Sequence, residues 1–103
     1  MSAHIDLPQE AIAEFCRRWG ITQLALFGSV LRDDFRPESD VDVLVRFAEE
    51  ARPTLFDMVR MTDELREVVG RPVDLVSRRA IEQSRNHLRR QAILGSAEVV
   101  YGT

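Results

Sequence analysis

The residues that could do chemistry gather in one short segment, FGSVLRDDFRPESDVDVL, which covers residues 27–44. Asp40 and Asp42 lie two positions apart in this segment, in a run whose β-branched residues favour a strand. Successive side chains of a strand alternate between its faces, so both carboxylates are expected to point the same way. Mg²⁺ is bound through one or two carboxylates together with substrate phosphates. The pair therefore indicates a metal site that works with a nucleotide.

The first half of the segment offers what the phosphates of a nucleotide would need. Residues 24–27 form a short apolar run typical of a buried strand, and Gly28 lets the backbone turn tightly after it. A helix that begins at Ser29 would present free N–H groups and a favourable dipole to phosphate. Ser29 could be only a helix cap, but capping and phosphate contact are compatible. Arg32 is expected to contact phosphate as well, although it could instead balance neighbouring acids in a solvated loop.

A third carboxylate, Asp74, lies inside the short β-type run RPVDLV at residues 71–76. A charged side chain among apolar neighbours is costly to bury without a partner. If this strand lies beside the strand of Asp40 and Asp42, the three carboxylates share one face. Asp74 would then act as a general base on an attacking hydroxyl. The sequence by itself does not fix the two strands as neighbours.

These residues resemble the nucleotidyltransferase superfamily typified by DNA polymerase beta, and within it the minimal nucleotidyltransferases, called MNT or MntA-like proteins. The resemblance rests on Gly-Ser, ten intervening residues, Asp-x-Asp and a later Asp, and it spans about residues 7–101. It implies an α/β (α+β) fold in which helices flank a small mixed β-sheet. It also implies two Mg²⁺ ions and a set of site residues. The catalytic and metal-binding residues would be Asp40, Asp42 and Asp74, and the nucleotide-binding residues Gly28, Ser29 and Arg32.

The resemblance further implies transfer of AMP from ATP to a hydroxyl, with release of pyrophosphate. MntA-like proteins are antitoxins of a type VII-like pair and adenylylate a tyrosine of a HEPN ribonuclease toxin. Two alternatives stay open. The chain could silence its HEPN partner by binding alone. The family commonly has Arg-Gly in the loop after Gly-Ser, and the Asp33 and Asp34 that follow Arg32 here would then mark decayed catalysis. It could also resemble antibiotic adenylyltransferases, although 103 residues leave little room for a small-molecule acceptor pocket.

Length and charge limit the other classes of function. With 103 residues, we expect one domain over residues 1–103. A net charge of −3 argues against a dedicated nucleic-acid binder, which would normally carry a basic face. A single cysteine, Cys16, excludes an internal disulfide and suits a reducing compartment. No targeting segment or membrane span is expected, so the predicted location is cytoplasmic. A homo-oligomer remains open.

Hydrophobic periodicity and turn residues predict the order of elements. Strands are expected at residues 21–27, 41–47, 72–77 and 98–101, and helices at 7–18, 29–32, from 55 to near Gly70, and 78–94. The last helix is strongly basic and could bind RNA or an acidic partner. Because it lacks interleaved aromatic residues, we interpret it as a solvated face or a protein interface. Its basic residues are Arg78, Arg79, Arg85, Arg89 and Arg90.

Overall fold

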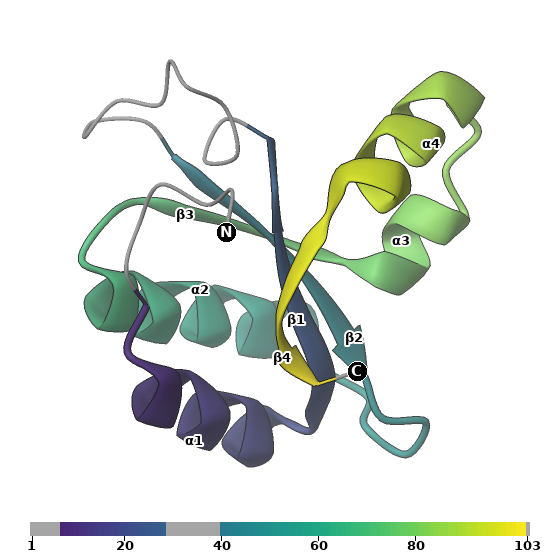
Figure 1. Cartoon of the computed structure of the whole chain (residues 1–103). Coiled ribbons are helices and arrows are strands. Elements are labelled where there is room, and N and C mark those ends of the chain that lie inside the picture. Colours follow the sequence, from purple (N-terminus) through teal and green to yellow (C-terminus); the bar gives the residue numbers. More distant parts are fainter. Residues whose placement is uncertain (1–6, 29–39, 103) are drawn as a thin grey trace.

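The computed structural model describes residues 7–28 and 40–102. In this part of the chain, helices lie on both faces of a four-stranded sheet (Figure 1). The strands are β1 (Ile21–Phe27), β2 (Val41–Phe47), β3 (Val73–Ser77) and β4 (Glu98–Gly102). The helices are α1 (Gln9–Trp19), α2 (Leu55–Val69), α3 (Arg78–Glu82) and α4 (His87–Ser96). The expected helix at 29–32 and loop at 33–39 lie outside the described residues.

The sheet is mixed, as expected. Its strand order is β3-β2-β1-β4, with β1 antiparallel to both β2 and β4. Strands β2 and β3 are parallel, and α2 forms the crossover between them that parallel neighbours require. The expected fold class, a small mixed sheet flanked by helices, is therefore confirmed. Strands β1 and β2 also have the bounds that their apolar runs predicted.

Each face of the sheet has its own apolar core. Val41, Val43 and Val45 of β2 pack with residues of α1 and α2 in one buried cluster. On the other face, a second cluster combines residues of β1 and β2 with Ile81 of α3 and Ile93 of α4. Asp42 lies between two valines of the first face, so strand alternation places it on the α3/α4 face. The hydrophobic pattern of β2 thus decides which way this acid points.

Local capping fixes the ends of α2. Thr54 and Asp57 form a capping box, in which each side chain accepts a hydrogen bond from the backbone N–H of the other residue, at 3.1 and 2.9 Å. Gly70 ends the helix in the left-handed conformation. At 15 residues, α2 is the longest helix that the structure describes. No helix among the described residues is long and apolar enough to cross a membrane.

The prediction of one continuous helix over residues 78–94 is wrong. The structure instead has α3 and α4, separated by residues 83–86. Asn86 caps α4 by accepting a hydrogen bond from the N–H of Arg89 at 3.0 Å, and Ser84 accepts one from the N–H of Asn86 at 3.3 Å. Short polar side chains compete with helical hydrogen bonding in this way. The Ser84-x-Asn86 pattern was therefore the signal for a break.

Candidate active site

The candidate site begins where β1 ends, at Gly28. This residue has a φ of 77°, in the left-handed region that favours glycine. A Cβ atom built on it would overlap the Oδ2 atom of Asp42 and lie 3.2 Å from the Asp42 Cγ. Phe27 and Asp42 are register partners across β1 and β2, which explains the close approach. Glycine is therefore required here for its backbone conformation and because the Asp42 carboxyl occupies the space of a side chain.

Asp42 also has a carboxylate beside it on the next strand. Asp42 and Asp74 are register partners in the parallel pairing of β2 and β3. Side chains of paired residues lie on the same face of a sheet, so both acids are on the α3/α4 face. Asp42 is half-buried and Asp74 is exposed. The adjacency on which the predicted role of Asp74 depends is thus present in the fold.

The start of β3 is held against β2 close to these acids. The backbone N–H of Val41 donates a hydrogen bond to the carbonyl oxygen of Pro72, at 2.9 Å. This bond lies one residue before the Asp42 pairing and two residues before Asp74. It fixes the strand ends that carry both carboxylates, so their relative position is set by backbone rather than by flexible loops.

Asp40 is exposed and immediately precedes β2. Among residues 7–28 and 40–102, no three histidine, cysteine, aspartate or glutamate side chains are grouped closely enough to hold a metal ion. A nucleotide-bound Mg²⁺ does not need three protein ligands, because substrate phosphates complete its shell. Asp42 and Asp74 carry the hard oxygen atoms that such an ion prefers. Metal binding by Asp40, Asp42 and Asp74 stays a prediction.

Two of the expected nucleotide-binding residues, Ser29 and Arg32, lie outside the described residues. Arg71, which the sequence analysis did not single out, is half-buried, directly precedes Pro72 and lies three positions before Asp74.

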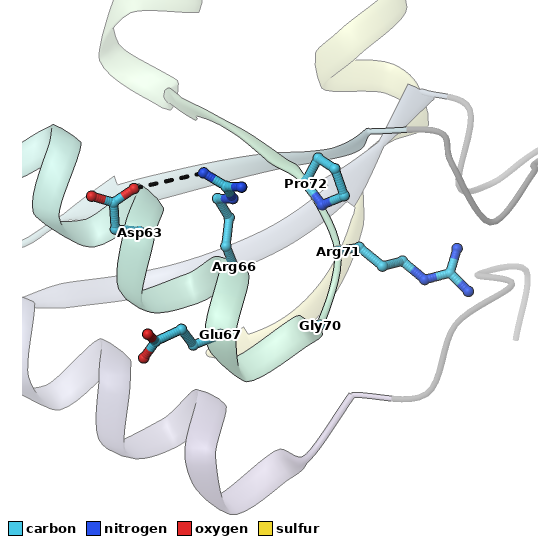
Figure 2. A pocket seen from close by; sticks show the side chains of 6 residues that line it. All are labelled: Asp63, Arg66, Glu67, Gly70, Arg71 and Pro72. Carbon is cyan, nitrogen blue, oxygen red and sulfur yellow. Dashed lines mark ion pairs between the residues drawn. The ribbon is translucent and has the colours of Figure 1, made fainter.

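Arg71 helps to line a hollow of about 540 Å³ at the C-terminal end of α2. Figure 2 shows Asp63 and Arg66 facing each other across the helix surface, joined by an ion pair of 3.9 Å, while the side chain of Arg71 extends away from them. The lining mixes acids and bases. This hollow lies beside the end of the sheet that carries Asp42 and Asp74, but none of the three predicted catalytic carboxylates lines it.

The arrangement of a glycine turn and strand-borne acids agrees with a comparison to protein families. Residues 9–100 match the model of the nucleotidyltransferase domain. The chain belongs to this nucleotidyltransferase family. The matched range includes the strands β1, β2 and β3, which carry Gly28, Asp42 and Asp74 at or next to their ends.

Individual relatives carry more specific names. A candidate protein adenylyltransferase of Methanocaldococcus jannaschii is 39% identical over 62 residues, which cover 60% of this chain and 64% of that protein. The protein adenylyltransferase MntA of Thermococcus cleftensis is 33% identical over 69 residues, covering 67% of this chain and 68% of that one. The chain thus spans less than two thirds of the length of the M. jannaschii relative in this match.

Solved structures of related fold include a candidate minimal nucleotidyltransferase, which is 36% identical with a TM-score of 0.66 over 86% of this chain and 85% of that chain. A toxin–antitoxin structure with AMP-PNP has a TM-score of 0.70 at 21% identity, covering 94% of this chain and 75% of the other. A tri-AMPylated HEPN toxin of Shewanella oneidensis in complex with its MNT antitoxin has a TM-score of 0.62 at 21% identity, covering 92% and 70%. The last two likenesses concern the fold alone.

Proposed function

We propose that this nucleotidyltransferase is a protein adenylyltransferase that moves AMP from ATP to a hydroxyl of a HEPN-domain toxin, and so acts as an antitoxin. The observation that carries the proposal is the pairing of Asp42 with Asp74, next to a glycine turn that the Asp42 carboxyl closely approaches. Two acids at fixed positions on adjacent strands are suited to phosphoryl chemistry with a metal-bound triphosphate.

The names of the relatives support the choice of acceptor. Protein adenylyltransferases appear among the matched sequences, and a HEPN toxin carrying AMP groups appears among the proteins of similar fold. The AMP-PNP of another structure of similar fold favours ATP as the donor. The proposal assigns a tyrosine as the acceptor residue and the cytoplasm as the location.

In the proposed reaction, the acceptor hydroxyl oxygen attacks the α-phosphorus of ATP. A new bond forms between that oxygen and the α-phosphorus. The bond from the α-phosphorus to the oxygen that bridges the α- and β-phosphates breaks, and pyrophosphate leaves. Asp74 takes the proton of the attacking hydroxyl. Its exposed carboxylate is accessible to a hydroxyl carried by another protein. Gly28 and Ser29 seat the phosphates, and Arg32 contacts them.

The proposed metal is Mg²⁺, as two ions. Asp42 and Asp74 would hold it together with Asp40, since carboxylate oxygen atoms are the protein ligands that this ion prefers. When bound, it would offset the negative charge that develops on the triphosphate and lower the pKa of the attacking hydroxyl. Asp42 is held by the sheet and by its contact with the Gly28 backbone, so it does not need to reorganise when the nucleotide arrives.

A protein acceptor suits the site better than a small molecule. Asp40 and Asp74 are both exposed, and the hollow nearest to them is lined by other residues. A small-molecule enzyme normally buries most of its substrate in a concave site. An acceptor that brings its own folded surface needs no such cavity, because that surface covers the carboxylates when it binds.

The direct test uses ATP with the radioactive label on either the α- or the γ-phosphate. The wild-type chain is incubated with Mg²⁺ and a candidate HEPN-domain partner from the same genome. Label from the α-position is expected to remain on the HEPN protein after denaturing electrophoresis, and label from the γ-position is expected to leave with pyrophosphate. Retention of the γ-label would indicate phosphoryl transfer and would contradict the proposal.

A further inference from the structure

A groove of about 720 Å³ lies at the end of the sheet opposite to Asp42 and Asp74. Figure 1 shows the C-terminal ends of β2 and β3 meeting there with the start of α2 and with α3. The apolar residues that line it include Phe47 from β2, Pro53 from the connection between β2 and α2, and Leu55 and Met58 from α2. Among the predicted site residues that the structure describes, which are Gly28, Asp40, Asp42 and Asp74, none lines the groove.

The rim of the groove is basic. Four arginines and two glutamates line it, in a chain whose net charge is −3. Arg78 is held in place by Gln23, whose Oε1 accepts a hydrogen bond from Nη1 at 2.9 Å, and by Glu82 at 3.4 Å. The side chains of the other three are exposed and make no ion pair with the residues that the structure describes. These three are Arg46, Arg52 and Arg79.

An exposed apolar surface continues from the groove along α2. Leu55, Phe56 and Val59 have 85%, 82% and 60% of their surface exposed. Leu55 and Val59 are four residues apart and therefore neighbours on one side of the helix, and Phe56 follows Leu55 directly. Aromatic residues, methionine and arginine are enriched in the core of protein–protein interfaces, and Phe56, Met58 and the arginines of the groove are of these types. The groove, and Leu55, Phe56 and Val59, are called the basic groove and its apolar extension below.

The combination of arginines, glutamates and exposed apolar residues favours a protein over RNA as the ligand of this surface. An RNA-binding surface would be more uniformly basic, whereas Glu49 and Glu82 both line this groove. Phe56 offers a π-face to a base, but Leu55 and Val59 beside it offer none, and these two lose water contact only against another apolar surface. The excess of arginine requires that the matching surface be acidic.

We infer that the basic groove and its apolar extension form a docking site for an acidic surface segment with an apolar anchor residue, carried by the protein that is adenylylated. This inference rests on the proposed function for the identity of the partner. Asp42 and Phe47 are five residues apart on β2, so the groove lies about 17 Å from the acids. A docked protein of ordinary domain size spans this distance, and its hydroxyl is presented to Asp74 while its segment occupies the groove.

The test compares the binding of three variants to a candidate HEPN-domain partner from the same genome, measured by biolayer interferometry. The groove variant is Arg52→Glu/Arg79→Glu with Leu55→Asp, which puts an acid in the first turn of α2, where the helix dipole favours it. The charge control is Arg85→Glu/Arg89→Glu, at exposed positions away from the groove. The active-site control is Asp42→Asn.

The groove variant is expected to bind at least about tenfold more weakly, mainly through faster dissociation. The charge control and Asp42→Asn are expected to bind as the wild type does. Wild-type association should slow as salt rises from about 50 mM to about 300 mM, because the rim charges are screened. Circular dichroism of all variants confirms that they are folded.

Binding of the groove variant at wild-type affinity would overturn the docking site, as would failure of the wild type to bind the HEPN protein. Two further results would overturn the docking site. In the first, the wild type binds a single-stranded RNA more tightly than the HEPN protein, and the groove variant loses that RNA binding. In the second, the wild type forms a dimer and the groove variant is a monomer. If the groove variant loses binding but the wild type transfers no AMP, the docking site stands and the proposed activity fails. These outcomes separate the two proposals.

Discussion

Asp42 and Asp74 are direct register partners on the parallel strands β2 and β3, and this pairing brings together residues that are 32 positions apart in the chain. The pairing depends on α2, which carries the chain from the end of β2 back to the start of β3. This pair of acids is therefore positioned by a supersecondary unit whose own stability comes from apolar packing and helix caps. Conservative substitutions in that packing should therefore have a smaller effect at the site than substitutions of Asp42 or Asp74 themselves.

Asp74→Asn removes the proposed proton acceptor and keeps the shape of the side chain. We expect kcat for AMP transfer to fall by about two to four orders of magnitude, with the affinity for the HEPN protein unchanged. Single-turnover kinetics with saturating ATP would measure this. Asp63→Asn, an exposed acid at the hollow of Figure 2, is the matched control and should keep its full rate. A fully active Asp74→Asn protein would exclude Asp74 as the base.

Gly28→Ala tests the contact between the glycine turn and Asp42. Its matched control is Gly70→Ala, because Gly70 has nearly the same φ, 78°, but nothing within 4 Å of an added Cβ. Both variants should lose about 1–2 kcal/mol of unfolding free energy from left-handed strain. Only Gly28→Ala displaces the Asp42 carboxyl, so only it should lose about 100-fold or more in transfer rate. Equal rates in the two variants would show that the close approach has no catalytic consequence.

Glu64 joins α1 to α2. It accepts a hydrogen bond from Trp19 Nε1 and pairs with Arg18, and its side chain is 24% exposed. We expect Glu64→Ala to cost about 1–3 kcal/mol of unfolding free energy, because the half-buried indole N–H of Trp19 loses its acceptor and Arg18 keeps only its pair with Glu14 at 3.8 Å. Asp63→Ala, whose side chain is 68% exposed, should change it by less than about 0.5 kcal/mol. Urea denaturation measures both, and equal losses would contradict this account.

Cys16 is fully buried in the core, and burial raises the pKa of its thiol from 9.0 to about 12, although the nearby Arg17 lowers it slightly. The thiol is therefore still protonated in the folded state at a pH where the unfolded chain has lost its proton. Stability is fully present below pH 9 and is lost as the pH rises from 9 toward 12, by up to about 1.4 kcal/mol per pH unit.

Chemical denaturation of the wild type at several alkaline pH values measures this loss. Cys16→Ala serves as the control, because it removes the thiol and leaves other titrating groups in place. The variant should have a flatter dependence of unfolding free energy on pH. Parallel curves for the two proteins would mean that the thiol does not control stability in this range.

The sequence predicted the elements whose signals are local. The apolar runs of β1 and β2 had the right bounds, and Gly70 marked the end of α2 because C-capping depends on residues close together in the chain. The break at Ser84 and Asn86 was missed because their side chains looked compatible with a polar helix face. In the structure, these side chains instead accept hydrogen bonds from backbone N–H groups, and the helix is interrupted there.

The features that depend on tertiary structure could not be predicted from residue patterns alone. The position of β3 beside β2 requires the crossover of α2, and the register that opposes Asp42 and Asp74 follows from packing of both faces. The overlap of Gly28 with the Asp42 carboxyl appears only once β1 and β2 are paired. The basic groove draws its lining from β2, α2, β3 and α3, so no single segment carries its pattern.

The most direct test of the central claim is the intact mass of a candidate HEPN-domain partner from the same genome after incubation with this chain, ATP and Mg²⁺, compared with an Asp42→Asn control. We predict mass increases of whole AMP units with the wild type, which disappear in the variant and when Mg²⁺ is chelated. An unmodified HEPN protein that the wild-type chain nevertheless binds and silences would contradict the claim. The nucleotidyltransferase fold would then serve to mask its partner, without catalysis by Asp42 and Asp74.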